Sequence, residues 1–252
     1  MKHLLTTFLL GFFCLNAWSQ KEDNDSEYRN GKFYSSSETE IIFSFANVEM
    51  DSVNYDNALR FSPVLNLMYR INYDVTKFLG FDAGLGIRNV GFIMNFPDTE
   101  NHLKKKFRTY NIGIPIGFKI GDLNQKHPFF FFAGNEIEMP FHYKEKTFEN
   151  GDKTDKIAGW FSKRSELFTQ SVYAGVQFPQ GFSIKFKYYL TNFFNKDFSY
   201  YQDGIALKPY AGMDVNVFYF SITWFPFKDL KSIEKDIAKP ESIETIYSQN
   251  RQ

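Results

Sequence analysis

The sequence predicts an all-β protein: an eight-stranded antiparallel transmembrane β-barrel with a short C-terminal helical tail. Three observations predict it, namely an N-terminal export signal, long stretches of alternating apolar and polar residues, and connections that are alternately long and short. Successive side chains of a strand point to opposite faces, so alternation gives one apolar and one polar face. The expected organisation is a signal peptide over 1–19, a flexible periplasmic lead over 20–37, the barrel over 38–226 and a periplasmic tail over 227–252.

The N-terminus has the form of a secretory signal peptide. Lys2 is the basic end, residues 4–15 form the apolar core, and Ala17 and Ser19 place small side chains at the cleavage-determining positions. The apolar run is shorter than the roughly 20 residues that span a bilayer, which disfavours the alternative of an uncleaved anchor helix. We therefore expect Sec-dependent export with cleavage before Gln20. Loss of Cys14 would then exclude disulfides, thiolate metal sites and a cysteine nucleophile.

The clearest alternation covers residues 59–74. Its apolar row is Leu59, Phe61, Pro63, Leu65, Leu67, Tyr69, Ile71 and Tyr73, and its polar row carries Arg60, Arg70 and Asp74. Similar stretches predict strands over 38–48, 59–73, 79–93, 107–120, 128–142, 166–178, 181–192 and 208–225. In the last of these, Met213, Val215 and Val217 oppose Asp214 and Asn216, and the phase then blurs, which we interpret as a hidden bulge. Pro63 and Pro115 donate no backbone hydrogen bond, so we place them at bulges as well.

The connections between these strands alternate in length. Residues 49–58, 94–106, 143–165 and 193–207 are long, whereas 74–78, 121–127 and 179–181 are short. Outer-membrane barrels have long outward loops, short periplasmic turns, an even strand number and both termini inside. This order and the export signal together predict the outer membrane of a Gram-negative cell. The many aromatic residues, 31 Phe and 15 Tyr, fit the aromatic girdles of such barrels.

The orientation of the rows determines what the barrel interior contains. With the apolar rows toward lipid, a network of charges faces the lumen: Arg60, Arg70, Asp82, Arg88, Glu136, Glu138, Lys185, Lys187 and Asp214. Eight strands enclose a lumen only just wide enough for side chains. Because an unpaired buried charge is costly, we expect these groups to pair and close the barrel. A narrow polar path for a small solute is the alternative. Small residues would leave room for long neighbours on facing strands: Gly84, Gly86, Gly113, Gly117, Gly134 and Gly175.

Enzymatic chemistry has one weak candidate. His142 falls near the outer end of the fifth strand, where Ser162, Ser165 and Glu166 could also lie, and some eight-stranded barrels modify lipid A with such groups. An exposed rim histidine is the simpler interpretation. No cluster has metal-ligand spacing and no glycine loop suits a phosphate, so no cofactor or metal is expected. Formal charge is balanced, with 29 basic and 29 acidic residues, so no nucleic-acid partner is implied.

Two segments outside the strands carry further expectations. In the longest loop, Trp160 and Phe161 could contact lipid headgroups, contact a protein partner, or fold back over the barrel mouth. Beyond residue 227, Leu230, Ile233 and Ile237 have helical spacing, which predicts a short amphipathic helix. This helix would rest on the barrel rim or dock a partner.

The signal ending at Ser19-Gln20, the stretch from Arg108 to Lys119 with Ile114, Pro115 and Ile116, and the aromatic last strand together resemble outer-membrane β-barrel proteins of Bacteroidota, including the PorT-like proteins. The resemblance implies a non-enzymatic eight-stranded barrel and a link to type IX secretion.

The function expected is therefore that of a structural or accessory subunit of an outer-membrane secretion or assembly complex, in contact with outer-membrane lipid and with protein partners. A lipid A-modifying barrel enzyme and a secreted, lipocalin-like small-molecule binder with its apolar rows inside are the alternatives.

Overall fold

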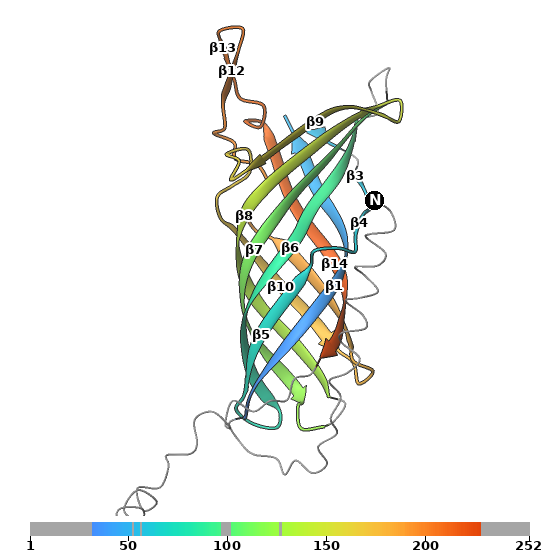
Figure 1. Ribbon diagram of the computed structural model, residues 1–252, viewed down its shortest axis with the longest axis vertical. Helices are drawn as coiled ribbons and strands as arrows, with labels where there is room; N and C mark the ends of the chain where they lie inside the picture. Colours follow the sequence, from blue (N-terminus) through green and yellow to red (C-terminus); the bar gives the residue numbers. More distant parts are fainter. Residues whose placement is uncertain (1–31, 52, 56, 97–101, 126–127, 228–252) are drawn as a thin grey trace, which may run out of the picture.

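The computed structural model describes residues 32–51, 53–55, 57–96, 102–125 and 128–227, which form an all-β structure (Figure 1). The predicted signal peptide, most of the lead and the C-terminal helix lie outside the described residues. None of the described residues belongs to a helix that is long and apolar enough to cross a membrane. The strands are β1 (Lys32–Met50), β2 (Val53–Asn54), β3 (Asn57–Ala58), β4 (Arg60–Ser62), β5 (Leu67–Asp74), β6 (Leu79–Phe96), β7 (Leu103–Asp122), β8 (Phe129–Glu149), β9 (Asp152–Trp160), β10 (Thr169–Gln177), β11 (Phe182–Tyr189), β12 (Tyr200–Gln202), β13 (Ile205–Leu207) and β14 (Met213–Phe227).

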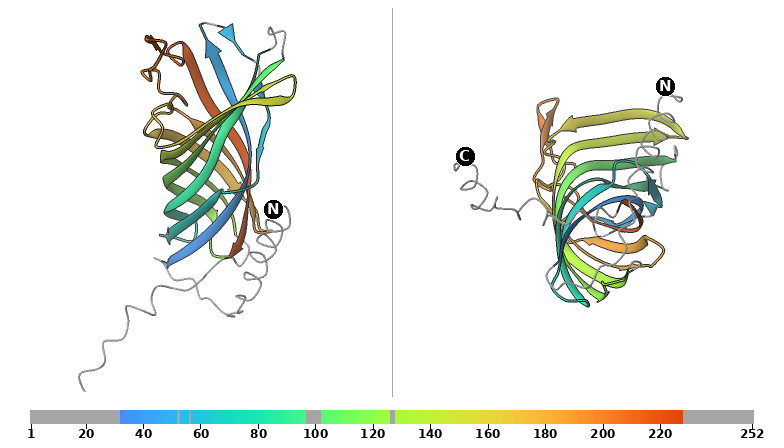
Figure 2. Two further views of the ribbon diagram at one scale, coloured as in Figure 1. Left: turned by 45° about the horizontal axis from the view of Figure 1, so that its top comes forward. Right: turned by 60° about the horizontal axis from the view of Figure 1, so that its bottom comes forward.

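Eight of the described strands close into one barrel (Figures 1 and 2). The order around the wall is β1, β5, β6, β7, β8, β10, β11 and β14, and β14 pairs again with β1. All of these pairs are antiparallel. The start of β1 and the end of β14 lie at the same end of the barrel, drawn at the bottom of Figure 1. The prediction of an eight-stranded antiparallel barrel is confirmed.

The connections sort to the two ends of the barrel as predicted. Short connections after β5, β7 and β10 lie at the end that holds the start of β1 and the end of β14; their described residues are 75–78, 123–125 with 128, and 178–181. The opposite end carries the long connections and two hairpins that extend beyond the wall, β8–β9 and β12–β13 (Figure 1). We call this end the upper end. Several strands exceed their predicted bounds: β8 continues to Glu149, and β1 begins at Lys32, inside the segment expected to be a flexible lead.

The strand predicted over 59–73 is broken at residues 63–66. Pro63 lacks an N–H and Leu65 has a φ of 63°, so the extended ladder cannot continue there. Side chains close the resulting gap in the wall: the Asn66 amide donates to the backbone oxygen of Glu40 at 3.2 Å, and its oxygen accepts the backbone N–H of Asn89 at 2.8 Å. Sequence alternation alone could not find this break, because the residue polarities continue through it.

Pro115, by contrast, lies within the long strand β7. Pairing between β6 and β7 passes from Ala83–Ile116 to Gly86–Gly113, so the ladder omits the position where proline has no N–H to donate. The register shift of β7 lies elsewhere, between Tyr110 and Asn111 opposite β8. The prediction of a bulge at Pro115 is therefore wrong.

The lower half of the barrel is apolar outside and polar inside. Ile114 on β7 and Ile184 on β11 are 55% and 45% exposed on the outer surface, whereas Arg70 and Lys185 are buried. The same pattern holds along β5, β10 and β11, where exposed apolar and buried polar residues alternate. The orientation of these rows is the one predicted from the sequence.

In the upper half, the polarity of the two faces is reversed. Along β14 the inward row reads Met213, Val215, Val217 and Tyr219 before it becomes polar, and the outward row begins with Asp214 and Asn216. An apolar core fills this half: Ile42, Ala46, Val48, Val90, Phe92, Met94, Phe107, Tyr143, Tyr189, Phe193, Phe194, Tyr210, Met213, Val215, Val217 and Tyr219. The barrel thus has a membrane-protein arrangement below and a soluble-protein arrangement above.

This reversal corrects two predictions about the last strand. Pairing between β14 and β1 is continuous from Met213 to Trp224, so no bulge interrupts that stretch. Within this stretch the phase does not slip, and what changes along the strand is the polarity of each face. The register shift of this pair lies beyond it, where Ser37 pairs with Phe227 and Thr39 with Trp224. Val215 and Val217 therefore point inward, and Asp214 points outward.

Candidate functional site: the charged barrel interior

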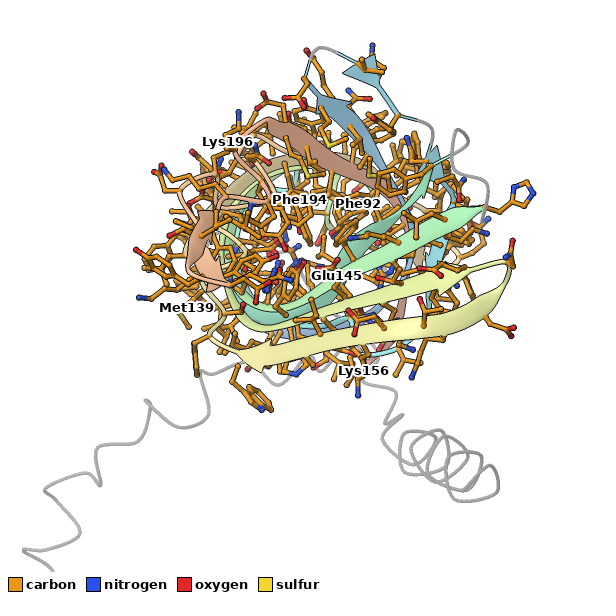
Figure 3. The ribbon with its side chains drawn as sticks, turned by 90° about the horizontal axis from the view of Figure 1, so that it is seen from above. Phe92, Met139, Glu145, Lys156, Phe194 and Lys196 are labelled. Atoms are coloured by element: carbon orange, nitrogen blue, oxygen red, sulfur yellow. The ribbon has the colours of Figure 1, made fainter. Side chains whose placement is uncertain are left out.

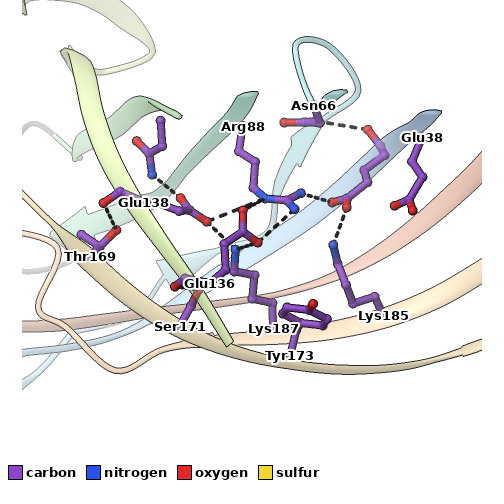
Figure 4. Close-up of polar contacts among 12 residues, drawn as sticks. Glu38, Asn66, Arg88, Glu136, Glu138, Thr169, Ser171, Tyr173, Lys185 and Lys187 are labelled. Atoms are coloured by element: carbon purple, nitrogen blue, oxygen red, sulfur yellow. Dashed lines mark hydrogen bonds and ion pairs between the residues drawn. The ribbon is translucent and has the colours of Figure 1, made fainter. Parts of the chain in front are cut away.

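The centre of the barrel is organised around one arginine. Arg88 projects from β6 and is fully buried. Its Nε and one terminal nitrogen each donate to a different carboxylate oxygen of Glu136 on β8, both at 3.0 Å, and its other terminal nitrogen lies 2.8 Å from Glu40 on β1 (Figure 4). A bidentate arginine–carboxylate pair is among the strongest charge-assisted arrangements in proteins. Three strands that are not mutual neighbours are thus joined through a single side chain.

Two lysines from β11 complete this central layer. The Lys187 ammonium donates to Glu136 at 2.6 Å and also to Glu138, and Lys185 donates to Glu40. The layer holds three cations and three carboxylates, so its formal charge is zero. This balance compensates the large cost of taking the charges out of water.

Neutral hydrogen-bonding groups satisfy the remaining oxygens of Glu138. The Tyr189 hydroxyl lies 2.8 and 2.9 Å from its two oxygens, and the Asn111 amide donates at 2.6 Å. Ser171 donates to the backbone oxygen of Glu136 at 3.1 Å. These groups fix the carboxylates in position and occupy space that water would otherwise fill.

Two smaller clusters lie toward the lower end. Arg70 on β5 pairs with Glu38 at 2.9 Å and with Asp82. Below it, Lys119 donates to Asp74 at 2.8 Å, to the Asn72 side-chain oxygen at 3.1 Å and to the Tyr34 hydroxyl at 2.7 Å. Ion pairs therefore lie inside the lumen at three successive levels.

Glycines make room for these long side chains. A Cβ on Gly113 would collide with the carboxylate of Glu136 and press on Glu138, and a Cβ on Gly117 or Gly134 would meet the Tyr173 hydroxyl. Glu136 and Glu138 belong to β8, the strand directly paired with β7. Gly113 and Gly134 thus accommodate side chains of a directly paired strand, and Gly117 of β7 accommodates Tyr173 from β10, one strand further round the wall, whereas the sequence led us to expect facing strands.

Aromatic side chains close the upper end of the lumen. Phe194, on the connection between β11 and β12, is fully buried, stacks on Tyr210 at 4.3 Å and meets Phe107 edge to face at 5.0 Å. Figure 3 shows Phe194 beside Phe92 in the middle of the barrel mouth. A small pocket between this layer and the ion pairs, lined by Val90, Asn111, Tyr189 and Phe193 among others, has a volume of about 10 Å³, which is room for no more than one water molecule.

The residues predicted for the lumen network are found in three situations. Those that join ion pairs in the lumen are Arg70, Asp82, Arg88, Glu136, Glu138, Lys185 and Lys187. Arg60 is buried but pairs with no described carboxylate; it donates to the backbone and side-chain oxygens of Asn89 and so helps to close the gap between β4 and β6. Asp214 is a correction: its side chain is 61% exposed and pairs at the surface with Lys196, because outward positions are polar at that height.

Four members of the network were absent from the prediction. Glu38 and Glu40 repeat on β1 the two-residue spacing of Glu136 and Glu138, which was the available signal. They were missed because their row continues with Ile42, a residue of the upper core. Lys119 and Asp74 lie on recognised polar rows, but no sequence pattern shows which strands bring them together.

The catalytic candidate is not assembled. His142 lies on the outer surface with its ring 4.8 Å from Trp160, and it shares no hydrogen bond with Ser162, Ser165 or Glu166. Burial and the nearby cations Lys144 and Lys156 lower the pKa of His142, which favours its neutral form. Trp160 is 69% exposed and stacks on Phe141 outside the barrel, which excludes its folding over the mouth.

Fold and interior together define a closed eight-stranded antiparallel barrel with a filled lumen. No protein-family model and no curated protein matches this sequence. Among solved structures, the chain is similar to the attachment invasion locus protein Ail of Yersinia pestis (13% identity, 78% of this chain and 99% of that chain, TM-score 0.31) and the outer membrane protein OprG of Pseudomonas aeruginosa (8%, 80% and 100%, 0.36). It is also similar to the outer membrane protein AlkL (10% identity, 83% and 96%, TM-score 0.36). Similarity at this level does not extend to function.

Proposed function

We propose that this chain is a non-enzymatic protein of the Gram-negative outer membrane, embedded through the lower half of its barrel. One observation carries this proposal: both faces of the wall reverse polarity at a common height. On β14 the outward row changes from Asn216 to Phe218, and on β1 from Asn47 to Phe45. An apolar outer surface with a charged interior is stable in hydrocarbon and costly in water.

The outward surface below that height supports insertion. It is a belt of exposed apolar side chains: Ile41, Phe61, Leu67, Tyr69, Ile71, Phe81, Leu85, Ile87, Ile112, Ile114, Ile116, Phe118, Ile120, Val172, Ile184, Phe186, Phe220 and Ile222. Soluble monomers rarely expose apolar patches larger than a few hundred Å². A lipocalin-like soluble barrel would bury this surface and expose Arg88 and Lys187, which is the opposite of the observed burial.

The barrel of this proposal is an anchor and not a pore. Three levels of ion pairs and the aromatic layer around Phe194 occupy the lumen across its length. The upper end then presents an extracellular surface made by the β8–β9 and β12–β13 hairpins. On this basis the narrow solute path is the weaker alternative.

An accessory role in a secretion or assembly complex, type IX secretion included, is a second candidate function. The β12–β13 hairpin favours it, because it stands away from the barrel with Tyr201 79% and Ile205 64% exposed (Figure 1). Apolar side chains on an extended hairpin are suited to burial against another protein. Crosslinking from Tyr201 in intact cells would identify that protein, and recovery of crosslinks only to lipid would contradict this candidate.

Fractionation and conductance test the anchor proposal together. We expect the protein in the outer-membrane fraction, with faster gel mobility unheated than boiled, and with no stable current steps in planar bilayers. Recovery in the soluble fraction without detergent would contradict membrane insertion. Steady single-channel conductance by the wild-type protein would contradict the closed lumen.

A further inference from the structure

The β8–β9 hairpin and the adjoining part of β7 form a sheet extension whose outer face is strongly basic. Lys106, Lys146 and Lys156 lie directly opposite one another on the three strands. In the row below, Arg108 lies opposite Lys144, and in the row above, Lys104 and Lys153 flank Phe148. We call these seven cations the basic face: Lys104, Lys106, Arg108, Lys144, Lys146, Lys153 and Lys156.

Carboxylates of the same strands lie on the other side of the sheet. Glu145 is buried on the inner face, where Lys105 pairs with it at 3.2 Å, and Asp155 is paired in register with Thr147, whose row is also the inner one. On β6, the neighbouring outward positions are Ile93 and Asn95. Among the described residues, these rows of the outer face therefore contain cations without an acidic partner.

Such an arrangement is unfavourable for the isolated protein. Like charges directly opposite one another destabilise a sheet. The electrostatics of Lys146 reflect this: burial, and then the charges of Lys144, Arg108, Lys153 and Lys106, lower its pKa. A dense anionic ligand would remove this repulsion.

The height of the basic face points to the identity of the anion. The outward row of β7 reads, from the top, Lys106, Arg108, Tyr110, Ile112 and Ile114. Tyr110 belongs to an aromatic row with Phe141, His142 and Trp160. At roughly 3.3 Å per strand residue, Arg108 lies only about 7 Å along the strand above this row. Going up the strand, aliphatic side chains come first, then aromatic ones, then cationic ones. The layers of a membrane leaflet have the same order, from acyl chains through the interface to the phosphates.

The other side of the barrel at this height differs. There the outward positions of β1 and β14 carry Asn47, Glu49, Asp214 and Asn216. A cationic ring around the whole barrel would indicate nonspecific attraction to the membrane surface. A cluster confined to the outer face of β7, β8 and β9 indicates a site.

We propose that the basic face binds the phosphate groups of anionic lipid in the outer leaflet, a proposal that rests on membrane insertion as proposed above. The bound headgroup lies against the outer face of β7, β8 and β9, with its acyl chains along the aliphatic row that begins at Ile112. Lys106, Lys146 and Lys156 contact its phosphates, and Trp160 covers the boundary between headgroup and chains.

Binding of bisphosphorylated lipid A to the detergent-solubilised full-length protein tests this inference. The variant Lys106→Gln/Lys146→Gln/Lys156→Gln removes the central row. The control Lys163→Gln/Lys196→Gln/Lys208→Gln removes the same charge elsewhere on the upper end, including the weak surface pair of Lys196 with Asp214. At about 1 kcal/mol per lysine near an anionic surface, the first variant is expected to bind at least about tenfold more weakly than wild type, and the control within about twofold.

Two further ligands identify the source of the anion. Dephosphorylated lipid A is expected to bind the wild-type protein no more tightly than bisphosphorylated lipid A binds the triple variant. A soluble sulfated polysaccharide is expected to compete weakly; if it binds through the three lysines more tightly than lipid A, the face belongs to a soluble polyanion and the proposal is overturned. Equal lipid A binding by the triple variant and its control would also overturn it.

Failure of the inference can be told apart from failure of membrane insertion. Heat-modifiable mobility is measured for all three proteins after reconstitution into vesicles. If they insert and bind lipid A equally, only the lipid site is wrong. If wild type does not insert, the proposed function fails first. If the triple variant alone fails to insert, single Lys146→Gln and Lys163→Gln variants replace the triple set, and equal lipid A binding by these two contradicts the site.

Discussion

Arg88 and Glu136 face each other across the barrel interior through two hydrogen bonds of 3.0 Å, with both side chains fully buried. The pair comes from β6 and β8, two strands separated in the wall by β7. Because Lys187 and Glu40 also contact the two partners, the pair connects four strands around the circumference. Neither residue faces solvent. The interaction therefore closes and stabilises the barrel and forms no part of a binding surface.

Removal of one partner should therefore be costly. We expect Glu136→Ala to lower the free energy of unfolding by about 3–5 kcal/mol, because Arg88 and Lys187 would lose their shared counter-charge in a dry interior. Urea unfolding in lipid vesicles measures it. Asp214→Ala is the matched control, since its exposed pair with Lys196 should be worth about 1 kcal/mol or less. Equal effects from the two substitutions would show that the central layer is hydrated.

Gly113 should not tolerate a methyl group. A Cβ at this position would press on the carboxylates of Glu136 and Glu138, which are held by several partners and cannot move freely. We expect Gly113→Ala to destabilise the protein by about 1–3 kcal/mol. Gly159→Ala on β9 is the control, because its Cβ would meet nothing closer than Ser162 at 3.8 Å. A neutral Gly113→Ala would mean that the network can repack.

The aromatic layer makes a separate prediction about the upper end. Phe194→Ala removes the ring that stacks on Tyr210 and touches Phe107, and we expect a loss of about 3–5 kcal/mol. The barrel of this variant should still conduct no ions, because the ion pairs around Arg88 still fill the lumen below. Thermal unfolding and planar-bilayer recording check the two parts, and a leaking Phe194→Ala barrel would show that the aromatic layer is the only seal.

Strand positions and the orientation of the lower rows could be predicted from the sequence because lipid imposes a simple rule on them. The lower parts of the strands predicted over 107–120 and 181–192 alternate with one period in one environment, so Ile114 and Lys185 were placed correctly. β14 obeys the same alternation, but it passes from one environment into another. Its two faces exchange polarity, and this exchange was misinterpreted as a bulge, which misplaced Asp214.

Other features depend on which strands meet, and local sequence does not encode that. The pairing of Arg70 with Glu38 joins β5 to β1 at the residue where the predicted barrel begins, and nothing in the local sequence indicates that these two strands meet. Phe194, which closes the upper end of the lumen, lies in the long connection predicted over 193–207, where no strand pattern indicates that a side chain is buried. The zero net charge of the chain likewise gives no indication of the basic face. Its cations come from separate segments that only the β7–β8–β9 register brings together.

The charge cost of a lipid-facing position gives a further prediction. Ile184→Arg places a cation in the middle of the apolar belt, and we expect it to lower stability in vesicles by about 2–4 kcal/mol. Asn47→Arg, on the outward surface of upper β1, should change stability by less than about 1 kcal/mol. Equal tolerance of arginine at both positions would place both outside the bilayer.

Labelling of single cysteines along the outward row of β7 tests the central claim, that the polarity reversal marks the membrane boundary. In reconstituted protein, Lys106→Cys should react quickly with a membrane-impermeant maleimide. Ile114→Cys and Ile116→Cys should be protected, and a fluorophore on either should be quenched from the lipid phase. Equal labelling of Lys106→Cys and Ile114→Cys, without quenching by lipid-phase probes, would contradict the account.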